Sequence, residues 1–161
     1  MHPGGVLMRN KADSVSNNKF RFWDSLLEKA DKRTNLHKNI RTISKPNGVH
    51  ALIGNGVTLG YVGTNDSTWV ELNINFKKDL EKTDNYYRVL LKRSDQIDRE
   101  YPELRIVWKP QMKSTINSRI ILSYSTKGGI SDEKYWEDIQ NDLIDRMIKF
   151  EAIFKKLISE V

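Results

Sequence analysis

An unbroken alternation of apolar and polar residues runs through residues 68–76 and is the longest of its kind in the chain. Side chains of a β-strand point alternately to opposite faces, so this stretch divides into two sets. The apolar set is Val70, Leu72, Ile74 and Phe76, and the other set is Trp69, Glu71, Asn73 and Asn75. The pattern predicts the central strand of a sheet, with one face on the core and the other directed away from it.

Two shorter β-type segments precede this strand. Residues 49–53 and 57–62 are separated by Gly-Asn-Gly at residues 54–56, and residues 63–67 connect the second segment to the central strand. Short loops rich in Gly, Asn and Asp join antiparallel neighbours, whereas parallel strands need a long crossover. We therefore predict a three-strand antiparallel meander.

Apolar residues at helical spacing predict a helix on each side of the meander. The first covers residues 20–32, with a cap from residues 16–18, and the second covers residues 83–101 and ends before Pro102. We expect the second helix to pack across the meander. Residues 34–47, which are rich in Asn, Thr, Ser and Lys, are expected to form an exposed connection.

Two more strands are predicted at residues 104–108 and 118–124, followed by a third helix with Ser131 as its N-cap. The apolar stripe of this helix continues to the end of the sequence. A helix of about thirty residues measures about 45 Å, which is more than a sheet of this size can cover. We therefore expect it either to break near Phe150 or to project toward another chain.

Together these elements predict an α+β fold in the order helix, three-strand antiparallel meander, helix, two strands, long C-terminal helix. One mainly antiparallel sheet is expected to be covered by the helices. Residues 1–18 have few large apolar side chains and are predicted to be a flexible leader. Residues 19–161 are predicted to form a single domain.

Composition and charge narrow the classes of function. The chain has 161 residues and no cysteine, which excludes disulfides and thiol chemistry and fits a reducing, cytoplasmic compartment. No signal-peptide pattern or membrane-spanning run is present, so we expect a soluble protein, and no motif indicates a cofactor. The net charge is +6, and residues 1–50 hold ten Lys and Arg against four acidic residues, so the whole excess lies there. This asymmetry indicates an anionic partner.

Two groups of basic residues are candidates for binding that partner. The first follows the first predicted helix and consists of Lys29, Lys32, Arg33, Lys38, Arg41 and Lys45. The second consists of Arg105, Lys109, Lys113 and Arg119, the last on the strand face opposite Ile120, Leu122 and Tyr124. Lys and Arg neutralise phosphates, and the neighbouring Asn, Ser and Thr donate hydrogen bonds to a backbone, so nucleic acid is the predicted ligand. Arg105 and Lys109 are expected to extend the contact, and an ordinary solvated surface is the alternative.

Glu71 and Asp66 are the acidic residues best placed for a divalent metal, because nucleases hold such ions with a strand-borne acid near a turn. Restriction-type nucleases place a lysine two residues after that acid, and Asn73 stands there instead. Glu71 is therefore predicted to be a solvated or paired strand residue. The three histidines are too far apart in sequence to indicate a zinc site. Trp69 differs from the other tryptophans, which we expect in the core, because its neighbours on the same face are polar.

Six segments carry a family resemblance: Phe22-Trp23-Asp24-Ser25-Leu26-Leu27, Val70-Glu71-Leu72-Asn73-Ile74, residues 94–97 before Tyr101, residues 104–108, Ser118-Arg119-Ile120, and Tyr135-Trp136. In this order they resemble an uncharacterised prokaryotic domain that often lies C-terminal to restriction-endonuclease-like or other nuclease domains. The resemblance implies a role beside nucleic-acid-processing or defence enzymes. It brings no established catalytic residues with it.

Three hypotheses for the function follow. The first is a non-catalytic nucleic-acid-binding or accessory module of a nuclease, restriction or defence system, whose binding depends on salt and tolerates changes of sequence. The second is a self-association or protein-interaction module, in which the apolar stripe from Phe150 to Val161 pairs with its copy in a homodimer. The third is a degenerate metal-dependent nuclease that uses Asp66 and Glu71.

Overall fold

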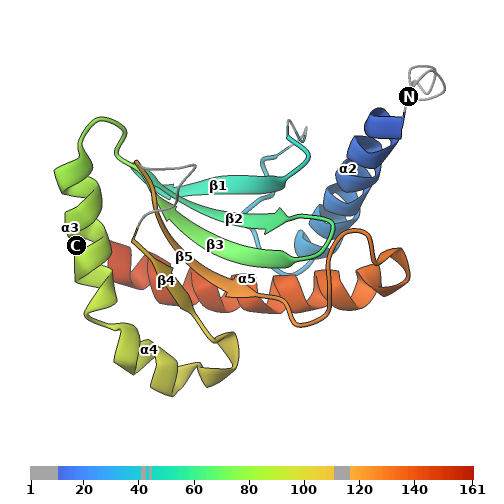
Figure 1. Cartoon of the computed structure of the whole chain (residues 1–161). Helices are drawn as coiled ribbons and strands as arrows, with labels where there is room; N and C mark the ends of the chain where they lie inside the picture. Colours follow the sequence, from blue (N-terminus) through green and yellow to red (C-terminus); the bar gives the residue numbers. More distant parts are fainter. Residues whose placement is uncertain (1–10, 41–42, 44, 111–116) are drawn as a thin grey trace.

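A five-stranded antiparallel sheet forms the centre of the molecule in the computed structural model, which describes residues 11–40, 43, 45–110 and 117–161 (Figure 1). The strands lie in the order β1-β2-β3-β5-β4, and their bounds are Gly48–Gly54 (β1), Val57–Gly63 (β2), Thr68–Ile74 (β3), Val107–Lys109 (β4) and Arg119–Tyr124 (β5). Every pairing is antiparallel, and β3 is central, as its alternation predicts.

Helices and short 3₁₀ turns accompany the sheet. Their bounds are Lys11–Ala30 (α2), Leu80–Leu91 (α3), Ser94–Glu100 (α4) and Trp136–Ser159 (α5) for the helices, and Pro102–Leu104 (η1) and Glu133–Tyr135 (η2) for the turns. The predicted α+β class is confirmed, with a helix first, then a three-strand meander, and a long helix at the C-terminal end. No helix in the described ranges has the length and apolar character needed to cross a membrane.

α5 lies along one face of the sheet and contacts β2 and β3 (Figure 1). Leu143 and Met147 of α5 are fully buried and belong to the same core as Leu59, Val70 and Leu72 of the sheet. We expected the second predicted helix to pack across the meander, and α3 does so only at β3, because its other contact is with β5. α5 has 24 residues, of which nine are buried, whereas α3 has 12, of which three are buried, so α5 contributes more to the core.

The expectation that the last helix breaks or projects is wrong. α5 is one helix of 24 residues and is about 36 Å long. Both of its halves pack against other elements in the described part of the chain. Phe150 and Phe154 are fully buried, and the Phe154 ring lies 6.5 Å from the ring of Trp108 in β4. α4 lies beside the same half, where Tyr101 and Ile153 line a shallow groove between the two helices. α4 thus adds to the surface that the sheet offers to α5, and the length estimate, which considered the sheet alone, did not include it.

The second predicted helix, residues 83–101, is two helices in the structure. α3 begins earlier than predicted, because the Asp79 side chain accepts a hydrogen bond from the Lys82 backbone N–H at 3.0 Å and caps the helix. A turn then redirects the chain into α4. This change of direction allows Leu90 of α3 and Ile97 of α4 both to reach the core.

The starts of the other two helices also differ from the prediction. α2 begins at Lys11, so residues 11–18 of the predicted leader continue the helix, and residues 1–10 lie outside the described residues. This stretch contains neither Pro nor Gly, which would stop a helix. α5 starts five residues after the predicted cap Ser131, because η2 precedes it.

The connection between α2 and β1 was expected to be exposed, but its middle packs on the core. His37 is buried, and Leu36 and Ile40 are partly buried against the core. His37 Nε2 lies 3.2 Å from the carbonyl oxygen of Leu59 in β2, and its ring is 4.9 Å from that of Tyr61. Burial lowers the pKa of His37 from 6.5 to about 4, so the imidazole is neutral at pH 7. The sequence alone did not distinguish this histidine from a surface one.

The buried His37 predicts a stability that depends on pH. The unfolded chain takes up a proton on this residue below pH 6.5, whereas the folded protein takes it up only near pH 4. The contribution of His37 to the free energy of unfolding is therefore fully present above pH 6.5. It is lost as the pH decreases toward 4, by up to roughly 3 kcal/mol. Urea unfolding of wild type and His37→Gln across this range measures the effect, and the variant should show a flatter profile. Equal slopes for the two proteins would contradict the assignment.

Candidate functional site on the open face of the sheet

The face of the sheet that points away from α5 has no helix of the described part of the chain lying over it (Figure 1). The strand register places its side chains in rows. Trp69 of β3 pairs with Tyr124 of β5, Glu71 pairs with Leu122, and Asn73 pairs with Ile120. The predicted orientation of Trp69, Glu71 and Asn73 away from the core is therefore confirmed.

A tryptophan, a carboxylate and a histidine form a polar cluster in the middle of this face. The Trp69 indole N–H donates a hydrogen bond to Glu71 Oε1 at 2.9 Å, and His50 Nε2 lies 3.4 Å from Glu71 Oε2. Glu71 is only 6% exposed. A buried carboxylate is costly without partners, and here each of its oxygens has one.

Gly60 of β2 makes this cluster possible. It lies between His50 of β1 and Glu71 of β3 in the register, and the His50 ring occupies the space that a side chain at position 60 would need. A glycine inside a strand often marks such a close approach, so Gly60 is a sequence signal for the approach of another side chain at this position. The partnership of His50 with Glu71 itself depends on the register of three strands, which sequence reasoning did not resolve.

One of the two predicted metal ligands, Glu71, belongs to this cluster, and the other, Asp66, does not. Both Glu71 oxygens are occupied by Trp69 and His50, which agrees with a paired strand residue. Asp66 is exposed in the turn between β2 and β3. Across the residues that the structure describes, no group of three His, Cys, Asp or Glu side chains is arranged to hold a metal ion.

A hollow of about 530 Å³ lies on the same sheet, toward the turn between β1 and β2. Its lining consists of Leu52, Asn55, Gly56, Thr58, Asn73, Asn75, Phe76 and Lys77. Three asparagines, a threonine and a lysine line it together with the apolar side chains of Leu52 and Phe76. Such a lining offers both donors and acceptors of hydrogen bonds to a polar ligand.

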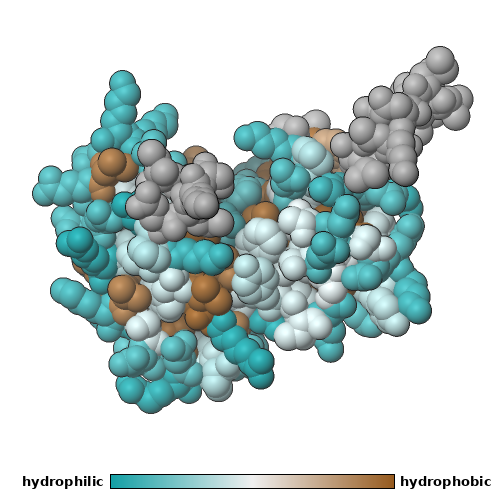
Figure 2. Space-filling view, in the orientation of Figure 1, coloured by the Kyte–Doolittle hydropathy of each residue, from teal (hydrophilic) through white to brown (hydrophobic). Residues whose placement is uncertain are grey.

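Trp69 and Tyr124 form an aromatic pair at the opposite end of the open face. Their ring centroids are 5.5 Å apart, with an interplanar angle of 63°, and Tyr124 is 40% exposed. The surface in this view is mostly hydrophilic or intermediate, and hydrophobic atoms gather only in small groups (Figure 2).

The first predicted basic group is divided by the fold. Lys29 donates a hydrogen bond to the Gln140 side-chain oxygen, and Arg33 pairs with Asp145 at 2.6 Å, so both join α2 and its end to α5. The members that are exposed and form no ion pair among the described residues are Lys32, Lys38 and Lys45. Arg41 lies outside the described residues.

The second predicted basic group lies at the other edge of the sheet. Arg105 is exposed before β4, and Lys109 pairs in register with Ile120 and so lies on the open face. Arg119 is buried on the helix side, where its Nε donates to Asp84 at 2.7 Å, and Lys113 lies outside the described residues. Arg119 therefore lies on the face of β5 opposite Ile120, Leu122 and Tyr124, as expected, but this face is turned toward the helices and not toward solvent. The two edges of the sheet are far apart, because four strand spacings, roughly 19 Å, separate β1 from β4.

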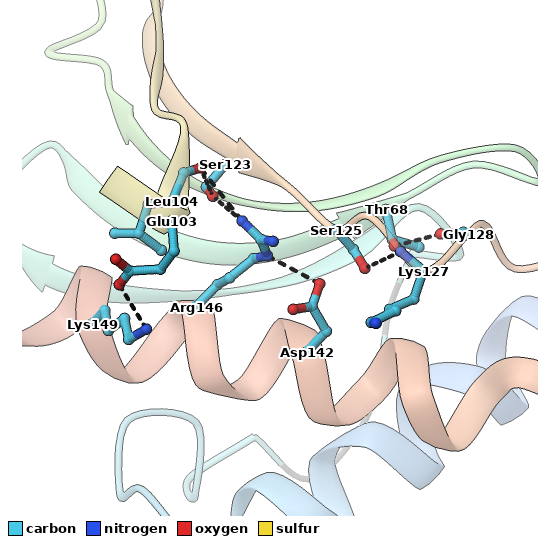
Figure 3. Close-up of polar contacts among 10 residues, drawn as sticks. All are labelled: Thr68, Glu103, Leu104, Ser123, Ser125, Lys127, Gly128, Asp142, Arg146 and Lys149. Atoms are coloured by element: carbon cyan, nitrogen blue, oxygen red, sulfur yellow. Dashed lines mark hydrogen bonds and ion pairs between the residues drawn. The ribbon is translucent and has the colours of Figure 1, made fainter. Parts of the chain in front are cut away.

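A second buried cation, Arg146, ties α5 to β5 and η1 (Figure 3). Its Nε donates to Asp142 at 3.0 Å, and its Nη1 donates to Ser123 Oγ at 2.7 Å and to the Leu104 carbonyl oxygen at 3.4 Å. Arg105, the next residue, has the left-handed φ of 48°. This cluster is largely buried, and we interpret it as a structural element that fixes the turn before β4.

A comparison with known protein families identifies the family of this chain. A family model described as a domain of unknown function (DUF4268) matches residues 18–158. The chain belongs to this family. Searches of curated proteins and of solved structures found no match.

The match to the DUF4268 domain contains the whole sheet and the cluster of Trp69, Glu71 and His50. It also contains the exposed lysines that follow α2. The family description states no activity, so the geometry of the open face and the distribution of charge are the basis for a function.

Proposed function

We propose that this DUF4268 domain is a non-catalytic nucleic-acid-binding module and that Lys32, Lys38 and Lys45 contact the phosphate backbone. The observation that supports the proposal most directly is that these three lysines are exposed and make no ion pair within the described residues. They belong to the region that carries the entire net charge of +6. Unpaired cations neutralise phosphates and release counterions, which is the main source of sequence-tolerant affinity.

The resemblance to a prokaryotic domain found beside restriction-endonuclease-like nucleases supports a more specific role. We propose that the domain acts in the cytoplasm as an accessory module of a nuclease or defence system and holds nucleic acid for a partner enzyme. Arg105 and Lys109 remain predicted contacts on the far edge of the sheet. A ligand that reaches them from Lys45 would have to cross the open face.

Replacing Lys32, Lys38 and Lys45 by alanine is expected to weaken binding to any oligonucleotide and to lower its salt dependence. Each lost phosphate contact reduces the slope of log K against log salt by about 0.7 for single strands and 0.9 for duplexes, so three contacts change it by roughly 2 to 3. Fluorescence anisotropy at several salt concentrations measures this slope. Arg33 is left intact because its ion pair with Asp145 contributes to packing.

The matched control replaces Lys78, Lys92 and Lys156 by alanine. These lysines are also exposed and take part in no ion pair in the described ranges, and the control changes the net charge by the same amount. We expect the control to bind nearly as wild type does. Equal losses in the two triple variants would reduce the effect to net charge and overturn the proposed phosphate site. A wild-type protein that binds no nucleic acid at low salt would overturn the proposed function itself.

A further inference from the structure

We propose that the open face of the sheet binds single-stranded nucleic acid by stacking an unpaired base on the Trp69 and Tyr124 pair. This inference rests on the proposed function and names the class of nucleic acid. In a duplex the faces of the bases are covered by their neighbours, so an aromatic side chain on a protein surface reaches them only in a single strand. Stacking of an unpaired base on an aromatic ring is the same for single-stranded DNA and single-stranded RNA.

The aromatic pair is accessible. Gly48, Val62, Trp69 and Tyr124 form one row of the register across β1, β2, β3 and β5, at the end of the sheet away from the hollow. Trp69 is half-buried and Tyr124 is exposed, and no helix of the described residues lies over the row. An aromatic ring in this position offers its face to any planar ligand.

The indole is also held in place. Trp69 donates its only polar hydrogen to Glu71, which His50 approaches from the other side. A ring already fixed by a buried acceptor loses little conformational freedom when a ligand binds, which favours affinity. Because the Glu71 carboxylate is 6% exposed and bonded on both oxygens, it presents little negative charge to a phosphate backbone.

One exposed lysine lies next to the aromatic row and can neutralise a phosphate. Lys45 lies three residues before Gly48, the β1 member of the row. Lys127 lies three residues after Tyr124, but its side chain is directed toward α5 (Figure 3). Asp66 in the β2–β3 turn is an exposed acid at the same end. Three strand spacings, roughly 14 Å, separate β1 from β5 in this row, a span that a bound segment of about 4–16 nucleotides covers.

The hollow at the other end of the face provides groups for a second base. Asn73 and Thr58 line it, and their side chains make no hydrogen bond within the residues that the structure describes. An amide has both donors and an acceptor, so it can pair with the edge of an unpaired base. Lys109 and Lys77 add positive charge near this end.

The test compares oligothymidine, oligouridine and a duplex, each fluorescein-labelled and about 15 nucleotides long, by anisotropy. We expect the single strands to bind more tightly than the duplex. Tyr124→Ala should weaken single-strand binding about tenfold to hundredfold, whereas Tyr124→Phe, which keeps the ring, should bind as wild type does. Tyr135→Ala is the matched control, because Tyr135 is also exposed but lies on η2, away from the open face.

Quenching of tryptophan fluorescence provides a second measurement. A base stacked on Trp69 should quench its emission, and Trp69→Phe should remove that part of the signal while the variant stays folded. Either DNA or RNA single strands would support the inference. Lysine-dependent binding that Tyr124→Ala leaves unchanged, or a preference for duplex, would overturn the inference but leave the proposed function intact. Absence of binding to all three nucleic acids would overturn both and direct attention to a protein partner.

Discussion

Replacing Phe154 by alanine should destabilise the fold by about 3–5 kcal/mol, the usual cost of removing a fully buried phenylalanine ring. The side chain is completely buried in α5, with the Phe150 ring 5.1 Å and the Trp108 ring 6.5 Å away. Its removal leaves a cavity where α5 meets β4, because neither neighbour can move far without losing its own packing. Urea unfolding followed by circular dichroism measures the loss.

Phe20→Ala is the control for this substitution. Phe20 lies on α2, is half-buried and does not belong to the main core, so the same change should cost much less. If Phe154→Ala and Phe20→Ala shift the unfolding midpoint equally, the C-terminal half of α5 does not pack as the structure shows.

The burial of Phe154 also affects the self-association hypothesis. Of the apolar stripe proposed to pair with its copy, Phe150, Ile153 and Phe154 are buried within the chain, and Val161 is exposed at its end. Phe154→Glu would place a charge in the core and unfold the protein, so loss of a dimer in that variant would not report on an interface. The oligomeric state of the wild-type protein, measured by light scattering, is the informative experiment, and self-association remains a prediction.

The strands were predictable because their signals are local. An alternation of period two in β3, and Gly, Asn and Asp in the two preceding turns, determine the meander without reference to the rest of the chain. The helices depend more on tertiary packing. Residues 83–101 show one continuous apolar pattern, and only the position of the core explains why the chain turns between Leu90 and Ile97.

The candidate site was predictable only in part, for the same reason. Trp69 and Glu71 are two residues apart on one strand, so their common face follows from the sequence. The approach of His50 to Glu71 does not, because it depends on how β1, β2 and β3 are aligned. Charge alone likewise did not show that Arg33 and Arg119 are engaged with Asp145 and Asp84 in packing helices.

Arg146→Met is the second substitution for which we expect a large loss, about 3–5 kcal/mol, because it breaks a buried, hydrogen-bonded ion pair. The side chain of Arg146 is 10% exposed and reaches Asp142, Ser123 and the carbonyl group of Leu104 (Figure 3). Methionine fills much of the same volume but satisfies none of these groups. The substitution should also loosen the turn that holds the left-handed backbone of Arg105.

Lys149→Met is a closely matched control. Lys149 lies one turn further along α5 and pairs with Glu103, the residue before Leu104, at 2.7 Å, but its side chain is 38% exposed. Solvent screens this pair, so its loss should shift the unfolding midpoint far less than the loss of Arg146. Hydrogen exchange at the amides of residues 104–107 adds a local measurement, and protection there should fall in Arg146→Met alone. Similar unfolding midpoints and similar protection in the two variants would contradict the prediction. The buried contacts of Arg146 would then stabilise the connection between α5 and η1 no more than the exposed pair of Lys149 does.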